Sequence, residues 1–261
     1  MAIAGWAVAG MMAASCASRA PFAFPTGTPT PTPDAAAAWQ TATAACRAAA
    51  NYSAEIVIDG RVGAETLRRV TLQGAMTRDG RIRLLAVAPI GGPIFILAGR
   101  ADRATLTLPR DHRVLVAPVA DIVNALIGLR FAPVDWVDVL SGCVSGSARA
   151  DGGQLGADLE IALGNGARAL LRKNGAEWRV VAGQRLDAVI EYREYQGRWP
   201  SLARISSAST TEVPINVGLA IGQIFVNADL SDRAFMPDVP ADFAPMTLAE
   251  LRAIGPLGEK R

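Results

Sequence analysis

The sequence predicts a mainly β protein with some α-helix, built on one curved antiparallel sheet with helices over its concave face. Three observations predict this fold. Many short runs alternate between apolar and polar side chains, the period of a strand with one face in water. Hairpin turn sequences separate several of these runs. In the middle of the chain, helical spacing replaces the alternation, so helices divide the sheet into two halves.

The start of the chain is typical of an export signal. Residues 2–15 are almost wholly apolar or small. The run is too short for a transmembrane helix, which needs about 20 residues, and suits the apolar region of a signal peptide. It ends in Ala13-Ala14-Ser15-Cys16, which resembles a bacterial lipobox. We therefore expect residues 1–15 to be a signal peptide and Cys16 to be the lipidated first residue. An ordinary export signal and a buried helix are the alternatives.

Residues 16–33 form the expected link between the lipid and the folded body. The Pro/Thr tract at residues 25–33 cannot pack a core and predicts an extended, solvated tether. Residue 17 is Ala and not Asp, and Asp at this position of Gram-negative lipoproteins usually signals retention in the inner membrane. We therefore expect an outer-membrane location.

The first half of the body is one helix followed by strands. Asp34 is the expected N-cap of a helix from Ala35 to about Ala50. From Tyr52 to Ala117 we expect six strands. Their inward faces carry the apolar members of each alternation: Ala54, Ile56, Ile58, Val70, Leu72, Met76, Leu106 and Leu108.

Two short helices and a second set of strands follow. Val119, Ile122, Val123 and Leu126 share one helical face. That helix ends at Gly128-Leu129, and Pro133 opens another that carries Trp136 and Leu140. About six more strands are expected between Leu155 and Leu230. The clearest alternation runs from Leu155 to Leu163, followed by the one from Leu186 to Tyr192. Hairpin turns are expected at residues 78–80, 165–166 and 174–175.

Composition excludes several classes of function. The 261 residues are 51% hydrophobic, enough for a sizeable core. Lys and Arg number 26 against 24 Asp and Glu, without a long basic run, so we expect no nucleic-acid partner. The single histidine, His112, lies among charged residues and is expected in a turn. The three cysteines fit no zinc spacing. No nucleophile, base and orienting residue can be assembled, so we expect no enzyme, no metal and no cofactor.

Three stretches of the body resemble the LolA/LolB lipoprotein-localisation superfamily. Residues 82–97 resemble its strand, loop and returning strand, residues 121–142 its pair of lid helices, and residues 172–181 its Asn-Gly hairpin with a Trp strand. The resemblance implies a half-open β-barrel of about 11–12 strands, with lid helices over an apolar concave face. It also implies four segments: residues 1–15, 16–33, a LolA/LolB-like domain at 34–234, and a tail at 235–261 with a short helix from Thr247 to about Ile254.

The resemblance implies a carrier function that involves no covalent step. A LolB-like lipoprotein on the periplasmic face of the outer membrane accepts acyl chains of lipoproteins from a periplasmic LolA-like carrier. It then inserts them into the membrane, and we expect it to act as a monomer. The sequence leaves open an envelope lipoprotein with a filled barrel in a structural or regulatory role, and a carrier of another lipid.

The residues expected to bind acyl chains are those that share the inward face of a strand or the apolar face of a helix. Any one of them could equally be plain core. They are Ile82, Leu84, Leu106, Leu159, Ile161 and Ile190 from strands, and Ile122, Leu126, Trp136 and Leu140 from helices.

One loop residue and two cysteines complete the expected site. Ile90, between Pro89 and Gly91, matches the exposed apolar loop residue by which the family is thought to touch the membrane; folding back into the core is the alternative. Lipidation of Cys16 would leave Cys46 and Cys143 as an even pair in an oxidising compartment, which predicts a disulfide. Two buried thiols are the alternative.

Overall fold

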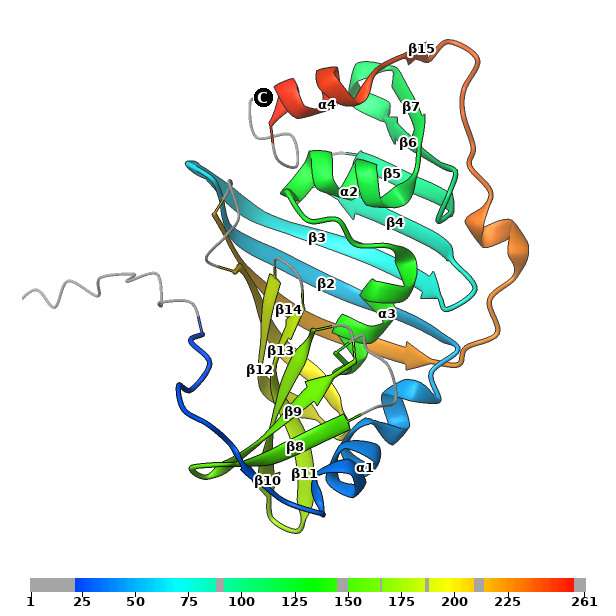
Figure 1. Cartoon of the computed structure of the whole chain (residues 1–261). Helices are drawn as coiled ribbons and strands as arrows, with labels where there is room; N and C mark the ends of the chain where they lie inside the picture. Colours follow the sequence, from blue (N-terminus) through cyan, green and yellow to red (C-terminus); the bar gives the residue numbers. More distant parts are fainter. Residues whose placement is uncertain are drawn as a thin grey trace, which may run out of the picture.

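One large, open sheet dominates the computed structural model, which describes residues 22–87, 92–144, 150–164, 166–185, 188–208 and 214–255. Within these residues, fifteen strands form the sheet in the order β1-β8-β9-β10-β11-β12-β13-β14-β2-β3-β4-β5-β6-β7-β15. Figure 1 shows a curved sheet with helices against it. The predicted class, a mainly antiparallel half-open sheet with helices, is confirmed.

The two halves of the sheet meet where β14 pairs with β2. The first half contains β2 (Asn51–Val62), β3 (Glu65–Thr77), β4 (Arg81–Val87), β5 (Pro93–Arg100), β6 (Ala104–Leu108) and β7 (Arg113–Ala117). The second contains β8 (Ala150–Leu155), β9 (Asp158–Leu163), β10 (Arg168–Asn174), β11 (Glu177–Arg185), β12 (Ala188–Gln196), β13 (Trp199–Ser207) and β14 (Ile215–Val226). The prediction of six strands in the first half is therefore confirmed. Six strands, β9 to β14, also lie between Leu155 and Leu230 as expected, and β8 precedes that range.

The alternation from Leu155 to Leu163 is not one strand, because it includes the last residue of β8, a turn and the whole of β9. Gly156, at a φ of +64°, turns the chain between β8 and β9, and Leu155 pairs with Asp158 across the turn. Leu159 is buried, and so are the next residues on its face. The prediction was wrong because a two-residue turn does not interrupt the apolar-polar rhythm.

Four helices accompany the sheet in the described residues: α1 (Ala35–Arg47), α2 (Val119–Ile127), α3 (Pro133–Ser141) and α4 (Leu248–Ile254). Asp34 occupies the N-cap of α1 without a side-chain capping bond, and the helix ends earlier than predicted. Gly128 and Gly142 end α2 and α3 with φ of +74° and +83°, a conformation that favours glycine. No helix in these ranges is both long and apolar enough to cross a membrane.

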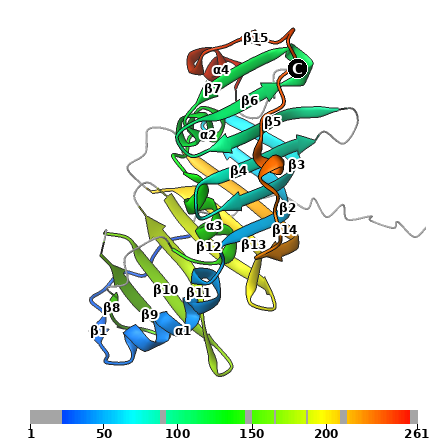
Figure 2. The ribbon, with the colours of Figure 1, turned by 90° about the vertical axis from the view of Figure 1, so that its right-hand side faces the viewer.

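The C-terminal residues wrap around the first half of the sheet (Figure 2). A 3₁₀ turn, η2 (Asp232–Phe235), lies against β4, where Arg81 covers the buried ring of Phe235 at 5.1 Å. Strand β15 (Ala244–Pro245) then pairs in parallel with β7 at the sheet edge. Helix α4 follows and contacts α2, so the tail runs from the end of β14 to one of the central helices.

Part of the predicted tether lies on the body and is not free in solvent. Strand β1 (Thr30–Pro31) pairs with Gly153 and Gln154 of β8. An edge strand offers unpaired backbone groups, and a Cβ on Gly153 would lie 2.4 Å from the Thr30 carbonyl oxygen, so this close pairing needs glycine. Farther upstream, the ring of Phe24 lies 4.4 Å from the Arg168 guanidinium carbon. Thr30 and Pro31 remain exposed on this edge, so these residues of the expected tether are solvated but held against the body.

His112 is the turn residue that was predicted. It follows a 3₁₀ turn, η1 (Pro109–Asp111), with a left-handed φ of +51°. Its Nδ1 lies 2.8 Å from the carboxylate of Asp242 in the C-terminal tail, and both side chains are exposed. The contact helps to hold the tail at the start of β7.

Candidate functional site

The site is a small apolar cavity between the concave face of the first half-sheet and helices α2 and α3. Its volume is about 40 Å³. Strands β2 to β5 form its floor and the two helices its roof. All lining side chains are hydrophobic: Ile56, Ile58, Leu72, Met76, Leu84, Phe95, Val123, Leu126, Ile127, Trp136 and Leu140. An apolar cavity of this kind stays dry.

The structure brings four of the ten predicted acyl-binding residues to this cavity: Leu84, Leu126, Trp136 and Leu140. The other six are buried in the surrounding core and do not line it: Ile82, Leu106, Ile122, Leu159, Ile161 and Ile190. Leu159, Ile161 and Ile190 lie on β9 and β12, in the other half of the sheet.

Sequence reasoning missed seven lining residues. Ile56, Ile58, Leu72 and Met76 stand on the inward strand faces that the alternation identified, and Val123 on the helical face. That signal was therefore present in the sequence. For Phe95 and Ile127 we find no comparable signal. Cys16 and Ile90 lie outside the described residues.

The roof contains an aromatic pair in which one ring has a buried hydrogen-bond donor. The rings of Phe131 and Trp136 meet edge to face with centroids 5.2 Å apart. The indole Nε1 of Trp136 is buried, and no acceptor lies within hydrogen-bond distance of it among the described residues. A buried donor without a partner costs about 1–3 kcal/mol.

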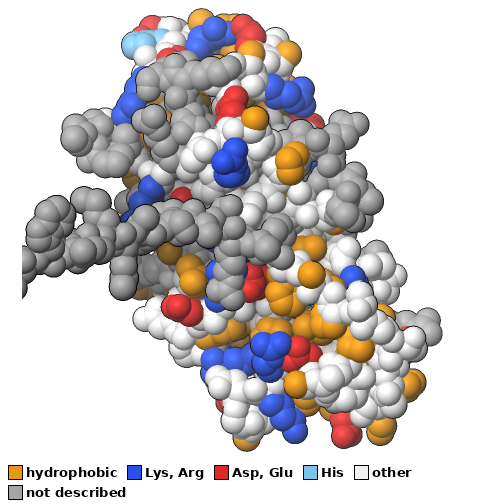
Figure 3. Space-filling model, turned by 90° about the vertical axis from the view of Figure 1, so that its left-hand side faces the viewer, with side chains coloured by type: hydrophobic (Ala, Val, Ile, Leu, Met, Phe, Trp, Pro, Cys, Tyr) orange, Lys and Arg blue, Asp and Glu red, His pale blue; other side chains and the backbone are white. Residues whose placement is uncertain are grey.

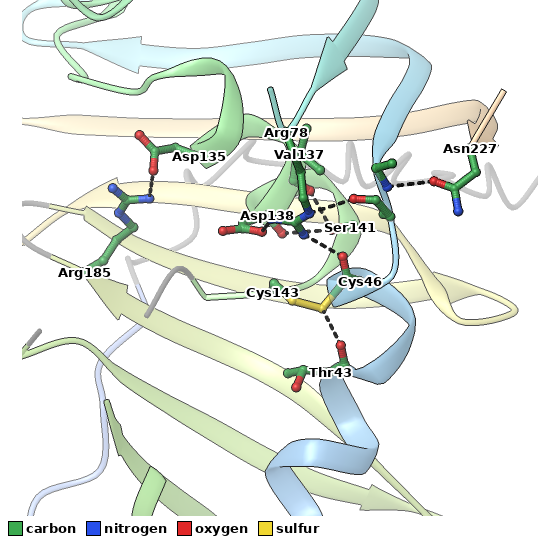
Figure 4. Close-up of polar contacts among 12 residues, drawn as sticks. Thr43, Cys46, Arg78, Asp135, Val137, Asp138, Ser141, Cys143, Arg185 and Asn227 are labelled. Atoms are coloured by element: carbon green, nitrogen blue, oxygen red, sulfur yellow. Dashed lines mark hydrogen bonds and ion pairs between the residues drawn. A yellow bond between two sulfur atoms is a disulfide. The ribbon is translucent and has the colours of Figure 1, made fainter. Parts of the chain in front are cut away.

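Helix α3 is bonded to its surroundings at three places (Figure 4). Near its start, Asp135 pairs with Arg185 of β11 at 2.6 Å. One turn later, Asp138 pairs with Arg78 at 2.7 Å. Just after its end, Cys143 forms a disulfide with Cys46 of α1, with Cα atoms 5.9 Å apart, a separation normal for a disulfide.

Arg78 joins α3 to the end of α1. It follows β3, and its Nε donates to the Ala49 carbonyl oxygen while Nη2 donates to the Cys46 carbonyl oxygen, each at 2.6 Å. Its Nη1 faces Asp138. A cation at a helix C-terminus satisfies carbonyl groups that lack helical partners. The same guanidinium thus stabilises α1 and neutralises a largely buried carboxylate on α3.

Helix α2 is held differently. Its only acidic residue, Asp121, pairs with Arg130 in the loop that follows the helix, at 2.7 Å. At its start, the Val119 amide donates to the Ala101 carbonyl oxygen at 2.9 Å. It also contacts α4. The contact of α2 with the sheet therefore depends on apolar packing.

The tyrosines beside the disulfide stay neutral. Tyr192 donates a hydrogen bond to the Cys143 carbonyl oxygen at 3.2 Å, and burial raises its pKa well above the usual value. Burial raises the pKa of Tyr52 and Tyr195 as well. These phenols support packing and do not titrate near neutral pH.

Charges on the outside are mixed. In Figure 3, Lys and Arg side chains lie among Asp and Glu side chains on the face shown. The described ranges contain no group of three or more His, Cys, Asp or Glu side chains placed to hold a metal ion.

Comparisons with known proteins give fold similarity alone. No protein-family model and no curated protein matches the chain. A LolA superfamily protein from Nitrosomonas europaea is similar in structure, with a TM-score of 0.49 and 11% identity over 78% of this chain and 97% of that one. A DUF1329 family protein from Desulfovibrio piger has a TM-score of 0.47 and 13% identity over 78% and 98% of the two chains. A domain from Vibrio parahaemolyticus, named for outer membrane lipoprotein sorting, has a TM-score of 0.39 and 13% identity over 71% and 88%.

Proposed function

We propose that the protein is an outer-membrane lipoprotein that binds acyl chains of lipoproteins in its apolar cavity and helps to insert them into the membrane. The observation that carries this proposal is the hydrophobic cavity enclosed between the concave sheet face and two helices. Lipid on Cys16 would anchor the body to the periplasmic face of the outer membrane. The chain would act as a monomer and receive its cargo from a LolA-like carrier.

The physical chemistry suits a carrier without a chemical step. Each methylene removed from water contributes about 0.8 kcal/mol, so a dry cavity can hold an acyl chain by burial alone. No bond needs to form or break. Release requires only a bilayer that holds the chain better, and Ile90 in its Pro/Gly-rich loop would bring the body to that bilayer.

The size of the cavity requires movement. A volume of about 40 Å³ has room for roughly three water molecules, much less than an acyl chain needs. Uptake therefore requires α2 or α3 to move away from the sheet. In the proposed site, Leu84, Leu126, Trp136 and Leu140 contact the chain directly. Of the other six predicted residues, Ile82, Leu106 and Ile122 belong to the core of the same half-sheet and its helix.

The same small volume supports a second candidate. A barrel filled by its own side chains would suit an envelope lipoprotein with a structural or regulatory role. A carrier of another lipid would differ from our proposal only in the chain that is bound.

A binding assay with a fluorescent fatty acid separates these candidates. We expect the mature chain to bind the probe and to release it when a diacylglycerol-modified lipopeptide competes. Leu126→Phe should weaken binding about tenfold because it fills the cavity, whereas Leu126→Met conserves volume and should change it little. Absence of binding by the chain without substitutions would favour the filled barrel. Displacement by phospholipid and not by lipopeptide would favour another cargo.

A further inference from the structure

The two roof helices differ in how they are held, and this difference indicates which one moves. Helix α3 has a disulfide and two short ion pairs that link it to α1, to the turn after β3 and to β11. The one ion pair from α2 ends on the loop beside it. Breaking a largely buried ion pair costs several kcal/mol, and the disulfide is covalent. Displacement of α3 is therefore much harder than displacement of α2.

Helix α2 also has the features of a movable cover. It contributes Val123, Leu126 and Ile127 to the cavity lining, so its displacement opens the cavity along its length. It ends at Gly128, whose left-handed φ of +74° marks a point where the chain direction changes. Hinges are commonly a few residues at the ends of elements.

The C-terminal tail packs against this cover. Leu251 of α4 and Met246 before it are buried at 2% and 7% exposure and belong to the same hydrophobic core as α2. Helix α4 is short, but Thr247 and Glu250 form a capping box at its start.

Bonds to β7 fix the position of α4. The Ala244 and Met246 amides donate to the carbonyl oxygens of His112 and Val114, both at 2.8 Å. The guanidinium of Arg113 donates to the Pro245 carbonyl oxygen at 3.1 Å and to the Glu250 carboxylate at 2.8 Å. The tail is thus fastened to the sheet edge on one side and packed on α2 on the other (Figures 1 and 2).

We propose that α2 is the moving lid of the acyl cavity, that α3 is its fixed wall, and that α4 is a latch that holds the lid shut. The proposal rests on the proposed function for its ligand. When α4 separates from α2, the lid can swing about Gly128, and acyl chains enter between α2 and strands β2 to β5. Glu250 and Arg113 are positioning residues, because they hold the latch and do not touch the ligand.

The test measures uptake of a fluorescent fatty acid and backbone amide exchange on the full mature chain. Glu250→Gln removes the Arg113 ion pair, and we expect uptake to become about two- to fivefold faster, the range for one exposed pair. Leu251→Ala removes the buried anchor of α4 and should have a larger effect. Glu177→Gln, which loses the 3.7 Å pair with Arg179 on a distant hairpin, is the matched control and should not change the rate. Urea unfolding checks that each variant is folded.

Amide exchange measures the opening of α2 without any ligand. In the unmodified chain, α2 amides should exchange at least about tenfold faster than α3 amides, and the latch variants should accelerate α2 alone. Reduction of the disulfide should leave the uptake rate unchanged. Faster exchange in α3 than in α2, or uptake that responds to reduction and not to the latch variants, would overturn the proposal. If no variant takes up the probe, the proposed function fails, and amide exchange still decides whether α4 holds α2.

Discussion

At the scale of single residues, Arg78 is the side chain that joins α3 to the end of α1 near the cavity. It is 29% exposed and Asp138 11%, so water screens their attraction only in part. Its other donors satisfy two carbonyl groups at the end of α1. The sequence marked this position only as part of a hairpin turn, because a charge beside Asp and Gly is ordinarily solvated.

We expect Arg78→Gln to lower the free energy of unfolding by about 2–4 kcal/mol, since the largely buried Asp138 carboxylate and two carbonyl groups each lose one charged partner. Urea unfolding at neutral pH measures the change. Arg130→Gln is the matched control, because Arg130 is 63% exposed and its pair with Asp121 should contribute less than about 1 kcal/mol. Equal effects of the two substitutions would contradict the role assigned to Arg78.

Residue patterns also explain how far the site could be predicted. Ile82 and Leu84 share one strand and one face, yet only Leu84 lines the cavity. The odd or even position of a residue along a strand determines whether its side chain points inward. A cavity forms where the helices above the sheet leave space, and this depends on side-chain volumes and on where the helices cross the strands. No local sequence pattern contains that information.

At the scale of elements, the alternation and the turn residues predicted most strands and both roof helices. These signals succeeded where the apolar periodicity begins and ends with the element, as in α2, which ends at Gly128 as expected. They failed where one alternation of apolar and polar residues continues through a turn, as in the β8–β9 hairpin. Strands β1 and β15 have two residues each and are defined by partners far away in sequence, so local periodicity could not reveal them.

The disulfide joins two of these elements, α1 and the end of α3. It closes a loop of 97 residues, for which chain entropy predicts a stabilisation of up to about 4.7 kcal/mol. We expect the Cys46→Ser, Cys143→Ser double variant to lower the free energy of unfolding by about 2–4 kcal/mol, and reduction of the unmodified chain to have the same effect. Two thiols that alkylate in oxidised, denatured protein would contradict the bond.

At the scale of the whole molecule, the open sheet has two edges, and a segment near each end of the chain covers one. Strand β1 covers part of β8, and β15 covers part of β7. Exposed edges invite pairing with other chains, so these short strands favour the solitary body that our proposal requires.

In our proposal, the location of the whole molecule depends on lipid at Cys16, the first residue after removal of the signal peptide. We expect mass spectrometry of membrane-extracted protein to show loss of residues 1–15 and a gain of acyl mass on Cys16. Cys16→Ser should abolish the acyl mass and move the protein to the soluble periplasmic fraction. A mature chain that keeps Met1, or an unmodified Cys16 on membrane-bound protein, would contradict lipid anchoring.

The pairing of β1 with β8 has a mechanical consequence for a lipid-anchored protein. In the proposed lipoprotein, the link from the lipid to the first strand is not the whole proline-rich tract but the thirteen residues between Cys16 and Thr30. Fully stretched at about 3.3 Å per residue, the fourteen steps from Cys16 to Thr30 span about 46 Å. This link also leaves the body at the β8 edge, whereas the latch lies at the β7 edge. If Cys16 carries lipid as we propose, the body could turn its lid toward the bilayer or away from it, and the length of this link would limit how far the body reaches to collect cargo.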